Sequence, residues 1–396
     1  MICIDSLHVS LNWFLLLIFG LWPYQQSVLV RLQLTILFSI LTTFIVFQFT
    51  TFITSKCTFD LLINVLASVL FYIIFIITYG SFSINIEVVK DLLEQLQHMY
   101  NELSDENEIN IIKKYGSNAK RYTATLLILS MSLTSVFTLY SFWPFMFDIL
   151  FPINETRPHL GLLLVTEYFI DQEKYYYLIL IHINAATFIG IITMLATGTI
   201  FIVYQQHACG MFRIASYRIE QAMAIDTLYK NNLIKETLIY KGLICAVDMH
   251  RKAMKFSDSS VSGFKVMFFL MIVAGVISTA INFFRLFQIV TFGYNIEKLL
   301  FPVIFLITNA LYMFLGSYFG QKIMDHNNDV LVTVYNVRWY TAPLHIQKMI
   351  LFLLQRGSKV FNLNIAGLFV GSFEGAATLV SATLSYFTVL HSTQSR

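Results

Sequence analysis

Residues 367–390, GLFVGSFEGAATLVSATLSYFTVL, decide how this chain folds, because they are apolar enough to enter a lipid bilayer and yet thin and polar. Gly367, Gly371 and Gly375 recur at every fourth position, which predicts two consecutive steps where a helix packs closely on a neighbour. Glu374 lies among them, and serine and threonine recur along the rest of the run. We expect a spanning helix whose polar face either packs tightly in its own bundle or borders a water-filled path.

The rest of the composition is that of an integral membrane protein. Hydrophobic residues make up 57% of the chain and charged residues only 12%, and the net charge of +3 is too small to predict nucleic-acid binding. Apolar runs long enough to cross ~30 Å of hydrocarbon lie at 28–53, 59–81, 124–151, 175–205, 264–291, 299–320 and 361–391. We therefore predict an all-α membrane protein with seven transmembrane helices.

The basic residues predict the orientation of these spans. Segments 82–123, 206–265 and 321–360 hold 5, 9 and 5 of the 26 lysines and arginines, so they are expected to face the cytoplasm. This gives an inverted topology, with a cytoplasmic N-terminus and the C-terminus outside. The sequon at Asn154 falls in a connection expected outside, and it is the predicted glycosylation site.

The connections predict further helices. The apolar run at 11–22 predicts an interfacial helix within residues 1–27, because Asp5 stands where a signal peptide carries positive charge. In 206–265 apolar residues return every three or four positions, so the fourth span is expected to continue as helix into the cytoplasm, with a solvated loop as the alternative. The run at 344–355 is too short to cross, which splits the last helix into a cytoplasmic part and a spanning part from about 361.

A pocket for a small apolar molecule is predicted among the outer halves of the spans. Rings that bury a ligand and a few polar groups that orient it occur at Ser68, Tyr72, Phe137, Tyr140, Ser141, Tyr177, Ile181, Asn184 and Phe188. Ordinary packing or a membrane belt is the alternative, since the chain holds 37 Phe and 21 Tyr. No catalytic motif and no metal-type spacing is present in the sequence, so we expect no enzyme, metal or cofactor; His326 is expected in a solvated loop.

The C-terminal region resembles the signature region of insect odorant receptors. Within residues 320–390 the matching positions include Gly320, Tyr335, Trp339, Tyr340, Pro343, Glu374, Tyr386 and Phe387. Thr333 and Val334 depart from the small alanines usual in that family, and the related gustatory receptors end in motifs that SYFTVLHS lacks. The second cytoplasmic connection is much shorter than that of the family's obligate co-receptor, so the chain resembles a ligand-tuned subunit.

This resemblance implies a ligand-gated, non-selective cation channel subunit that binds a small volatile molecule. It implies a heterotetramer with the co-receptor in the cell membrane of sensory neurons, surrounded by lipid and with no nucleic-acid partner. In that family the last helix, here 361–391, lines the pore, and its apolar constriction falls on Val389. Thr378, Ala382 and Ser385 continue the same stripe at helical spacing.

The resemblance also implies a division of the chain. Residues 28–205 hold spans one to four with the ligand pocket, 206–265 a cytoplasmic helical anchor, 266–320 spans five and six, and 321–360 the rest of the anchor with the first part of helix seven. The alternatives are a metabotropic receptor coupled to a G protein, a gustatory-type channel and a transporter.

Overall fold

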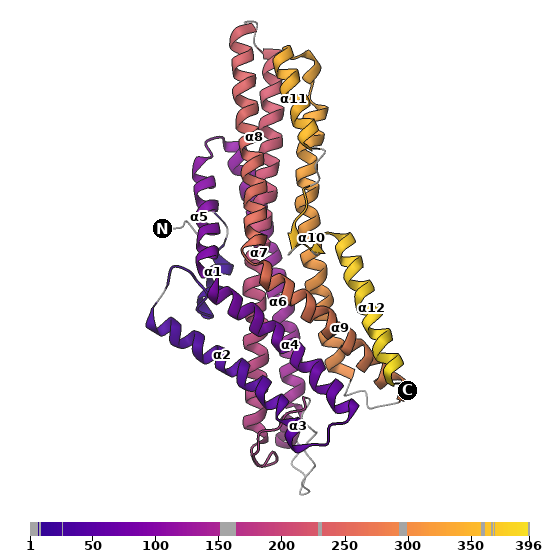
Figure 1. Ribbon diagram of the computed structural model, residues 1–396. Coiled ribbons are helices and arrows are strands. Elements are labelled where there is room, and N and C mark those ends of the chain that lie inside the picture. The colour runs from indigo at the N-terminus through magenta and orange to yellow at the C-terminus, as the bar shows by residue number, and fades with distance from the viewer. Residues whose placement is uncertain are drawn as a thin grey trace.

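The computed structural model describes residues 7, 9–25, 27–150, 164–228, 232–292, 299–357, 361–365, 367 and 369–394. In this part of the chain the structure is almost entirely helical (Figure 1). The elements are α1 (Ser10–Ile18), α2 (Val28–Phe49), α3 (Thr51–Thr54), α4 (Phe59–Ile84), α5 (Ile86–Glu102), α6 (Glu106–Leu150), α7 (Tyr176–Leu228), α8 (Asn232–Ser262), α9 (Lys265–Phe292), α10 (Leu300–Asn336), the 3-10 helix η2 (Trp339–Thr341), α11 (Leu344–Gly357), β1 (Asn364–Ile365), β2 (Phe369–Val370) and α12 (Phe373–Gln394).

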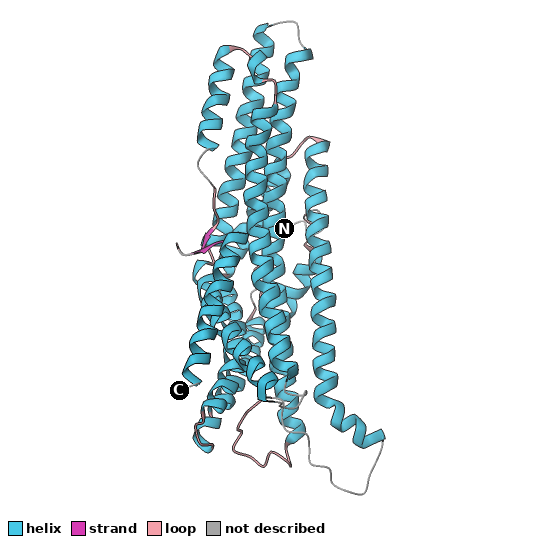
Figure 2. Cartoon of the chain, turned by 90° about the vertical axis from the view of Figure 1, so that its right-hand side faces the viewer, coloured by secondary structure: helices cyan, strands magenta, loops and turns pink. Residues whose placement is uncertain are grey.

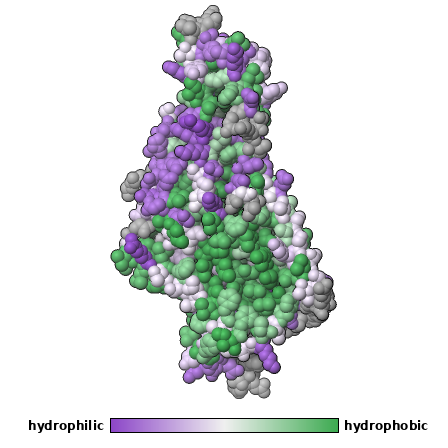
Figure 3. Space-filling view, viewed as in Figure 1, coloured by the Kyte–Doolittle hydropathy of each residue, from purple (hydrophilic) through white to green (hydrophobic). Residues whose placement is uncertain are grey.

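Seven of the described helices are long and apolar enough to cross a membrane, which confirms the predicted all-α fold with seven such helices. They are α2 with α3, α4, α6, α7, α9, α10 and α12. Their apolar side chains form a broad band across the lower half of the molecule, with polar residues above and below it (Figure 3). The protein is therefore a multi-pass membrane protein.

Polar side chains fix where several of these helices begin. Ser27 accepts a hydrogen bond from the Val30 amide at 3.3 Å, and Thr58 accepts one from the Leu61 amide at 3.2 Å. These caps satisfy amides that have no partner within the first turn of a helix. The predicted starts at 28 and 59 agree with the structure because the cap residue and the apolar run coincide in the sequence.

Helices α7 and α10 continue well beyond the apolar band, as predicted for the connection 206–265. Helix α8 returns along the second half of α7, and α11 lies beside α10 (Figures 1 and 2). We call this bundle, formed by residues 206–262 and 321–357, the extension. Arg218 of α7 holds Glu108 of α6 through two hydrogen bonds of 2.6 and 2.8 Å, and His250 of α8 lies 2.8 Å from Asn327 of α10.

The expectation of a solvated loop at His326 is wrong. His326 lies in α10, where its Nδ1 is 2.7 Å from the Lys322 carbonyl oxygen and its Nε2 is 2.8 Å from the Tyr115 hydroxyl. Helix α10 continues past the predicted end of the sixth span, so it carries this histidine into contact with α6.

The predicted start of the terminal spanning helix at 361 is also wrong. β1 (Asn364–Ile365) pairs antiparallel with β2 (Phe369–Val370) in a small hairpin, and Gly367 between them has a φ of +79°, a backbone conformation that glycine adopts without strain. Helix α12 begins at Phe373, where Ser372 accepts a hydrogen bond from the Gly375 amide at 3.0 Å. Gly367 and Gly371 therefore lie outside any helix.

Close packing at Gly371 nevertheless occurs, against a different partner from the one expected. A methyl group placed on Gly320 of α10 would overlap the carbonyl group of Gly371 and lie only 3.0 Å from its Cα. The backbone of α10 thus touches the backbone of the hairpin. This contact ties the start of α12 to α10, and it requires glycine at 320, whereas a methyl group on Gly371 would lie at an ordinary 3.6 Å from Gly320 Cα.

The N-terminal helix α1 packs against the long helix α7. Buried Asn12 donates a hydrogen bond of 2.9 Å to Thr199, and Tyr79 of α4 donates one of 3.1 Å to the Phe19 carbonyl just after α1. The position of this helix at the membrane interface stays a prediction. The predicted glycosylation site, Asn154, lies outside the described residues.

Candidate functional site

Three of the predicted pocket residues lie at a buried aromatic cluster in the half of the bundle away from the extension. Tyr72 of α4 is fully buried, and its hydroxyl lies 2.6 Å from that of Thr187 on α7. Phe137 of α6 reaches the cluster through Phe301 and Phe305 of α10, since successive rings are 5.3 and 5.7 Å apart. Ser68, one turn before Tyr72, is buried and accepts a hydrogen bond from Gln48. We call this group, with Phe71, the outer cluster.

The other predicted pocket residues are not brought into this cluster. Tyr177, Ile181 and Phe188 are on an exposed face of α7, and the Ile181 side chain is 54% exposed. Asn184 is half-buried and donates back to the Leu180 carbonyl. The inward face of α7 instead carries buried residues one position away, such as Ile183 and Thr187. Tyr140 is half-buried and Ser141 buried, and Ser141 donates to the Phe137 carbonyl.

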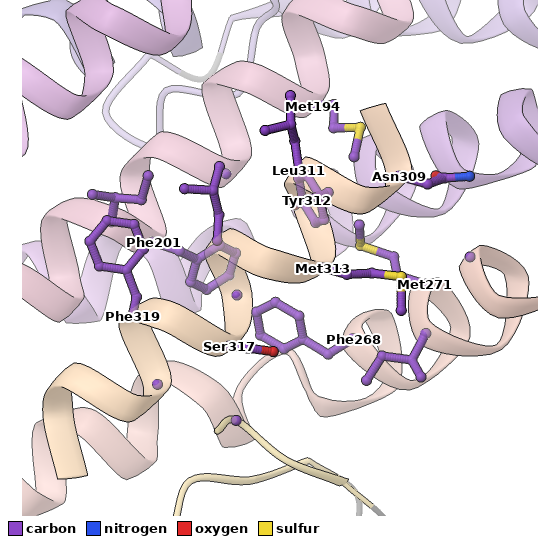
Figure 4. Close-up of a pocket in the computed structure, with 18 of the residues that line it drawn as sticks. Met194, Phe201, Phe268, Met271, Asn309, Leu311, Tyr312, Met313, Ser317 and Phe319 are labelled. Atoms are coloured by element: carbon purple, nitrogen blue, oxygen red, sulfur yellow. The ribbon is translucent and has the colours of Figure 1, made fainter. Parts of the chain in front are cut away.

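A cavity of about 280 Å³ lies deeper in the bundle, in the half nearer the extension. It is bounded mainly by α7, α9 and α10, with α4, α6, the hairpin and the start of α12 completing its wall (Figure 4). Its lining is mostly apolar and includes Met194, Phe201, Phe268, Met271, Leu311 and Phe319. None of the nine predicted pocket residues is among the described residues that line it.

Helix α12 has the most open surface of the seven apolar helices. Only 11% of its apolar stretch is buried within the chain, against 61% for α7. One face packs on α9, where the Phe387 ring lies 5.7 Å from Phe283 and 6.0 Å from Phe287. The remaining faces carry exposed side chains, and Figure 1 shows α12 at the edge of the bundle.

The predicted pore residues lie largely on the open part of α12. Thr378, Ser385 and Val389 are exposed, and Val389 is 60% exposed, whereas Ala382 is half-buried. The Thr378 and Ser385 hydroxyls each donate to the carbonyl four residues earlier. Their protons are thereby satisfied within the helix.

The other signature residues lie at the ends of α12 and in the extension. Glu374 is exposed in the first turn of α12, where a negative charge complements the helix dipole. Tyr335 and Tyr340 are exposed on the extension, whereas Trp339 packs against the core and Pro343 is half-buried. Tyr386 is exposed beside Phe387 near the far end of α12.

The sequence interpretation missed the cavity residues. Gly275 of α9 is buried, yet a methyl group built on it would meet no atom within 4 Å, which marks it as a cavity-facing position. No sequence pattern distinguishes it from Gly198, where the ring of Tyr312 would lie at 3.5 Å. Such a difference depends on the neighbouring helix, not on the residues next to the glycine.

A seven-helix membrane protein with a buried apolar cavity beside a largely uncovered terminal helix has the build of a membrane receptor for small apolar molecules. Comparison with known proteins gives the family. The model of the family described as 7tm Odorant receptor matches residues 58–382, and the chain belongs to this family. It is therefore an odorant receptor and not an enzyme.

Individual relatives agree with this assignment. The chain is 21% identical to Odorant receptor 85c of Drosophila melanogaster over 306 residues, which cover 76% of this chain and 75% of that protein. Its fold is similar to that of the insect olfactory receptor OR5 from Machilis hrabei, with a TM-score of 0.77 at 16% identity, over 98% of this chain and 99% of the other. The structure of that receptor in complex with eugenol gives the same TM-score at 15% identity, over 98% and 100% of the two chains.

Proposed function

We propose that the chain is the ligand-tuned subunit of an odorant-gated, non-selective cation channel that it forms with a co-receptor as a heterotetramer. It acts in the cell membrane of sensory neurons, with its N-terminus and the extension in the cytoplasm and its C-terminus outside. A small volatile molecule binds the open arrangement better than the closed one, so binding shifts the population toward the open state.

The observation that carries this proposal is the open face of α12. An apolar helix that leaves most of its surface uncovered within its own chain needs another covering, and hydroxyl groups along that surface suit a water-filled path. The packed face of the same helix, at Phe387, fixes which side turns outward. The family resemblance assigns the apolar constriction of that path to Val389, which is 60% exposed on this open face.

A second feature supports assembly with other subunits. The extension lies beyond the apolar band, yet it carries large apolar side chains on its surface, and such patches mark protein interfaces. The exposed residues are Tyr240, Ile244, Tyr335, Tyr340, Leu344, Leu351 and Phe352. Contacts between extensions suit the anchor that holds the tetramer together.

The outer cluster is the proposed odorant site. Tyr72, Phe137 and Ser68 offer rings and hydroxyl groups in a buried setting, and Phe305 stacks on Phe71 with ring centroids 4.2 Å apart. Because Phe387 packs beside the outer ends of α4 and α9, a ligand that spreads this cluster also moves the packed face of α12.

The test is to express the chain with the co-receptor and record odorant-evoked current for Val389→Ala and Val389→Glu. Val380→Ala is the matched control, because Val380 is also exposed on α12 and lies nine residues away, on the opposite face at about 100° per residue. A smaller or charged side chain in an apolar constriction eases its hydration. We expect altered permeability or leak current in both Val389 variants and parent-like current in the control; unchanged permeability and gating at Val389 would overturn the proposal.

A further inference from the structure

We infer that the cavity between α7, α9 and α10 is a second ligand site, distinct from the outer cluster, that takes a small neutral molecule with an apolar body and one hydroxyl group, such as an alkylphenol. The inference goes beyond the proposed function, because that function needs only the outer cluster.

The shape and walls of the cavity set the size and charge of the ligand. A dry apolar cavity of about 150 Å³ is known to hold benzene, and the cavity here measures about 280 Å³, so it admits a benzene ring with a short alkyl chain. None of its described lining residues carries a charge. A charged ligand would lose its hydration without gaining a partner, so the ligand is neutral.

Two hydroxyl groups on the lining call for a hydroxyl on the ligand. The Tyr312 and Ser317 hydroxyls line the cavity and make no hydrogen bond to any residue that the structure describes (Figure 4). Gln205 also lines the cavity, but its amide nitrogen donates to Ser260 at 3.3 Å and its Oε1 is enclosed. A ligand hydroxyl both donates and accepts, so it pairs with both of these hydroxyl groups, whereas an ether or ester only accepts.

The register of the two helices places these groups close together. Tyr312 of α10 lies opposite Gly198 of α7, and further along the Cys209 thiol lies 3.9 Å from the Lys322 carbonyl oxygen. Ser317 lies between these two levels on the same helix as Tyr312. A buried hydroxyl without a partner costs free energy, and a ligand hydroxyl at this level removes that cost.

The cavity has a route from the lipid and a contact with the terminal helix. Leu129 of α6 and Leu311 of α10 line it and are 40% and 37% exposed, and we take this side as the route by which an apolar molecule enters from the bilayer. Gly375 and buried Leu379 of α12 form part of the opposite wall. An occupant therefore touches the first turns of α12, and it stabilises whichever arrangement of that helix leaves the cavity open.

The experiment measures binding of 4-propylphenol to the solubilised full-length chain with its co-receptor, from the ligand-dependent rise in melting temperature. 4-Propylanisole, which has the same body without a donor, is the matched ligand. Gly275→Leu fills the cavity, and Val273→Phe, an enlargement on the exposed side of the same helix, is the matched variant. Tyr312→Phe removes one hydroxyl from the lining and leaves the rest of the ring in place.

We expect 4-propylphenol to bind more tightly than the anisole, Gly275→Leu to weaken its binding at least tenfold, and Val273→Phe to bind as the parent does. Tyr312→Phe should weaken it by roughly two- to tenfold, the worth of one hydrogen bond, and it decides the matter if Gly275→Leu does not fold. Unchanged binding in both cavity variants, or equal binding of phenol and anisole, overturns the inference. So does a lipid chain that co-purifies with the parent and that the phenol does not displace.

This readout needs no current. Phenol binding that is lost in Gly275→Leu supports the site even if no odorant-evoked current is found. Current that depends on Val389, with phenol binding insensitive to the cavity variants, leaves the proposed function standing and removes the second site.

Discussion

The contact between Gly320 and Gly371 makes a sharp prediction for Gly320→Ala. The added methyl group would overlap the Gly371 carbonyl group and lie 3.0 Å from Gly371 Cα, and both are backbone atoms that no side-chain rotation can move away. The hairpin must therefore shift as a unit, and α12 starts immediately after it, at Phe373.

The magnitude follows from two opposing effects. Inserting a methyl group into a closely packed site costs about 1–3 kcal/mol, and replacing glycine by alanine inside a helix returns roughly 0.5–1 kcal/mol. The net loss of stability is about 1–2 kcal/mol. Gly316→Ala, one turn earlier on the same helix, meets no atom within 4 Å and keeps only the favourable effect. The two variants should therefore differ by about 2 kcal/mol, which is roughly 30-fold in an equilibrium constant.

Two measurements check this difference. The melting temperature of the solubilised complex should fall for Gly320→Ala and hold or rise for Gly316→Ala. The odorant concentration for half-maximal current should shift by up to about 30-fold for Gly320→Ala, because the hairpin displaces the start of the helix assigned to the pore. If both variants melt together and give the same dose–response curve, the backbone contact does not constrain α12 and the reasoning is refuted.

Three further predictions concern other parts of the chain. Burial lowers the pKa of His250, so the folded state resists the proton that the unfolded chain takes up. The free energy of unfolding should therefore fall as the pH drops below about 6.5, by at most about 1.4 kcal/mol per pH unit, and the melting temperature should fall with it. His250→Gln should flatten this dependence on pH. Glu108→Gln keeps the shape of a side chain that is 8% exposed but leaves the Arg218 guanidinium without its counter-charge, and it should lower stability by roughly 1–3 kcal/mol in the same assay. Tyr72→Phe breaks the 2.6 Å hydrogen bond across the outer cluster and should cost about 1 kcal/mol while raising the odorant concentration needed for current; unchanged potency argues against the odorant lying there.

The hydrophobic runs located the spans because hydropathy adds up along the chain without regard to neighbours. The predicted starts at 28, 59, 175 and 299 lie within one residue of the starts of the helices observed. The periodicity of residues 206–265 predicted the extension for a related reason, since an amphipathic pattern shows in the local sequence. The same averaging failed at 361, where the apolar residues of the hairpin merged with those of α12.

Local signals in the sequence mark the hairpin at this point. Gly367 lies in a turn, and Ser372 caps the helix that follows. A turn glycine followed by a cap residue is typical of a hairpin that leads into a helix. A spacing of four residues between glycines predicts helix packing only when a helix connects them. Here the first two glycines serve a turn and a backbone contact with α10 instead.

The amino-acid sequence alone determined the fold class, the number of apolar helices and the family, because these depend on composition, on local periodicity and on a signature that lies in one stretch. Only the tertiary structure decided which residues face one another. Tyr72 meets Thr187, and Gly320 meets Gly371, across long stretches of intervening chain. Whether Gly275 opens on a cavity or Ile181 on the outside of the bundle depends on how separate helices are rotated against each other, and side-chain volumes on both partners set that rotation together.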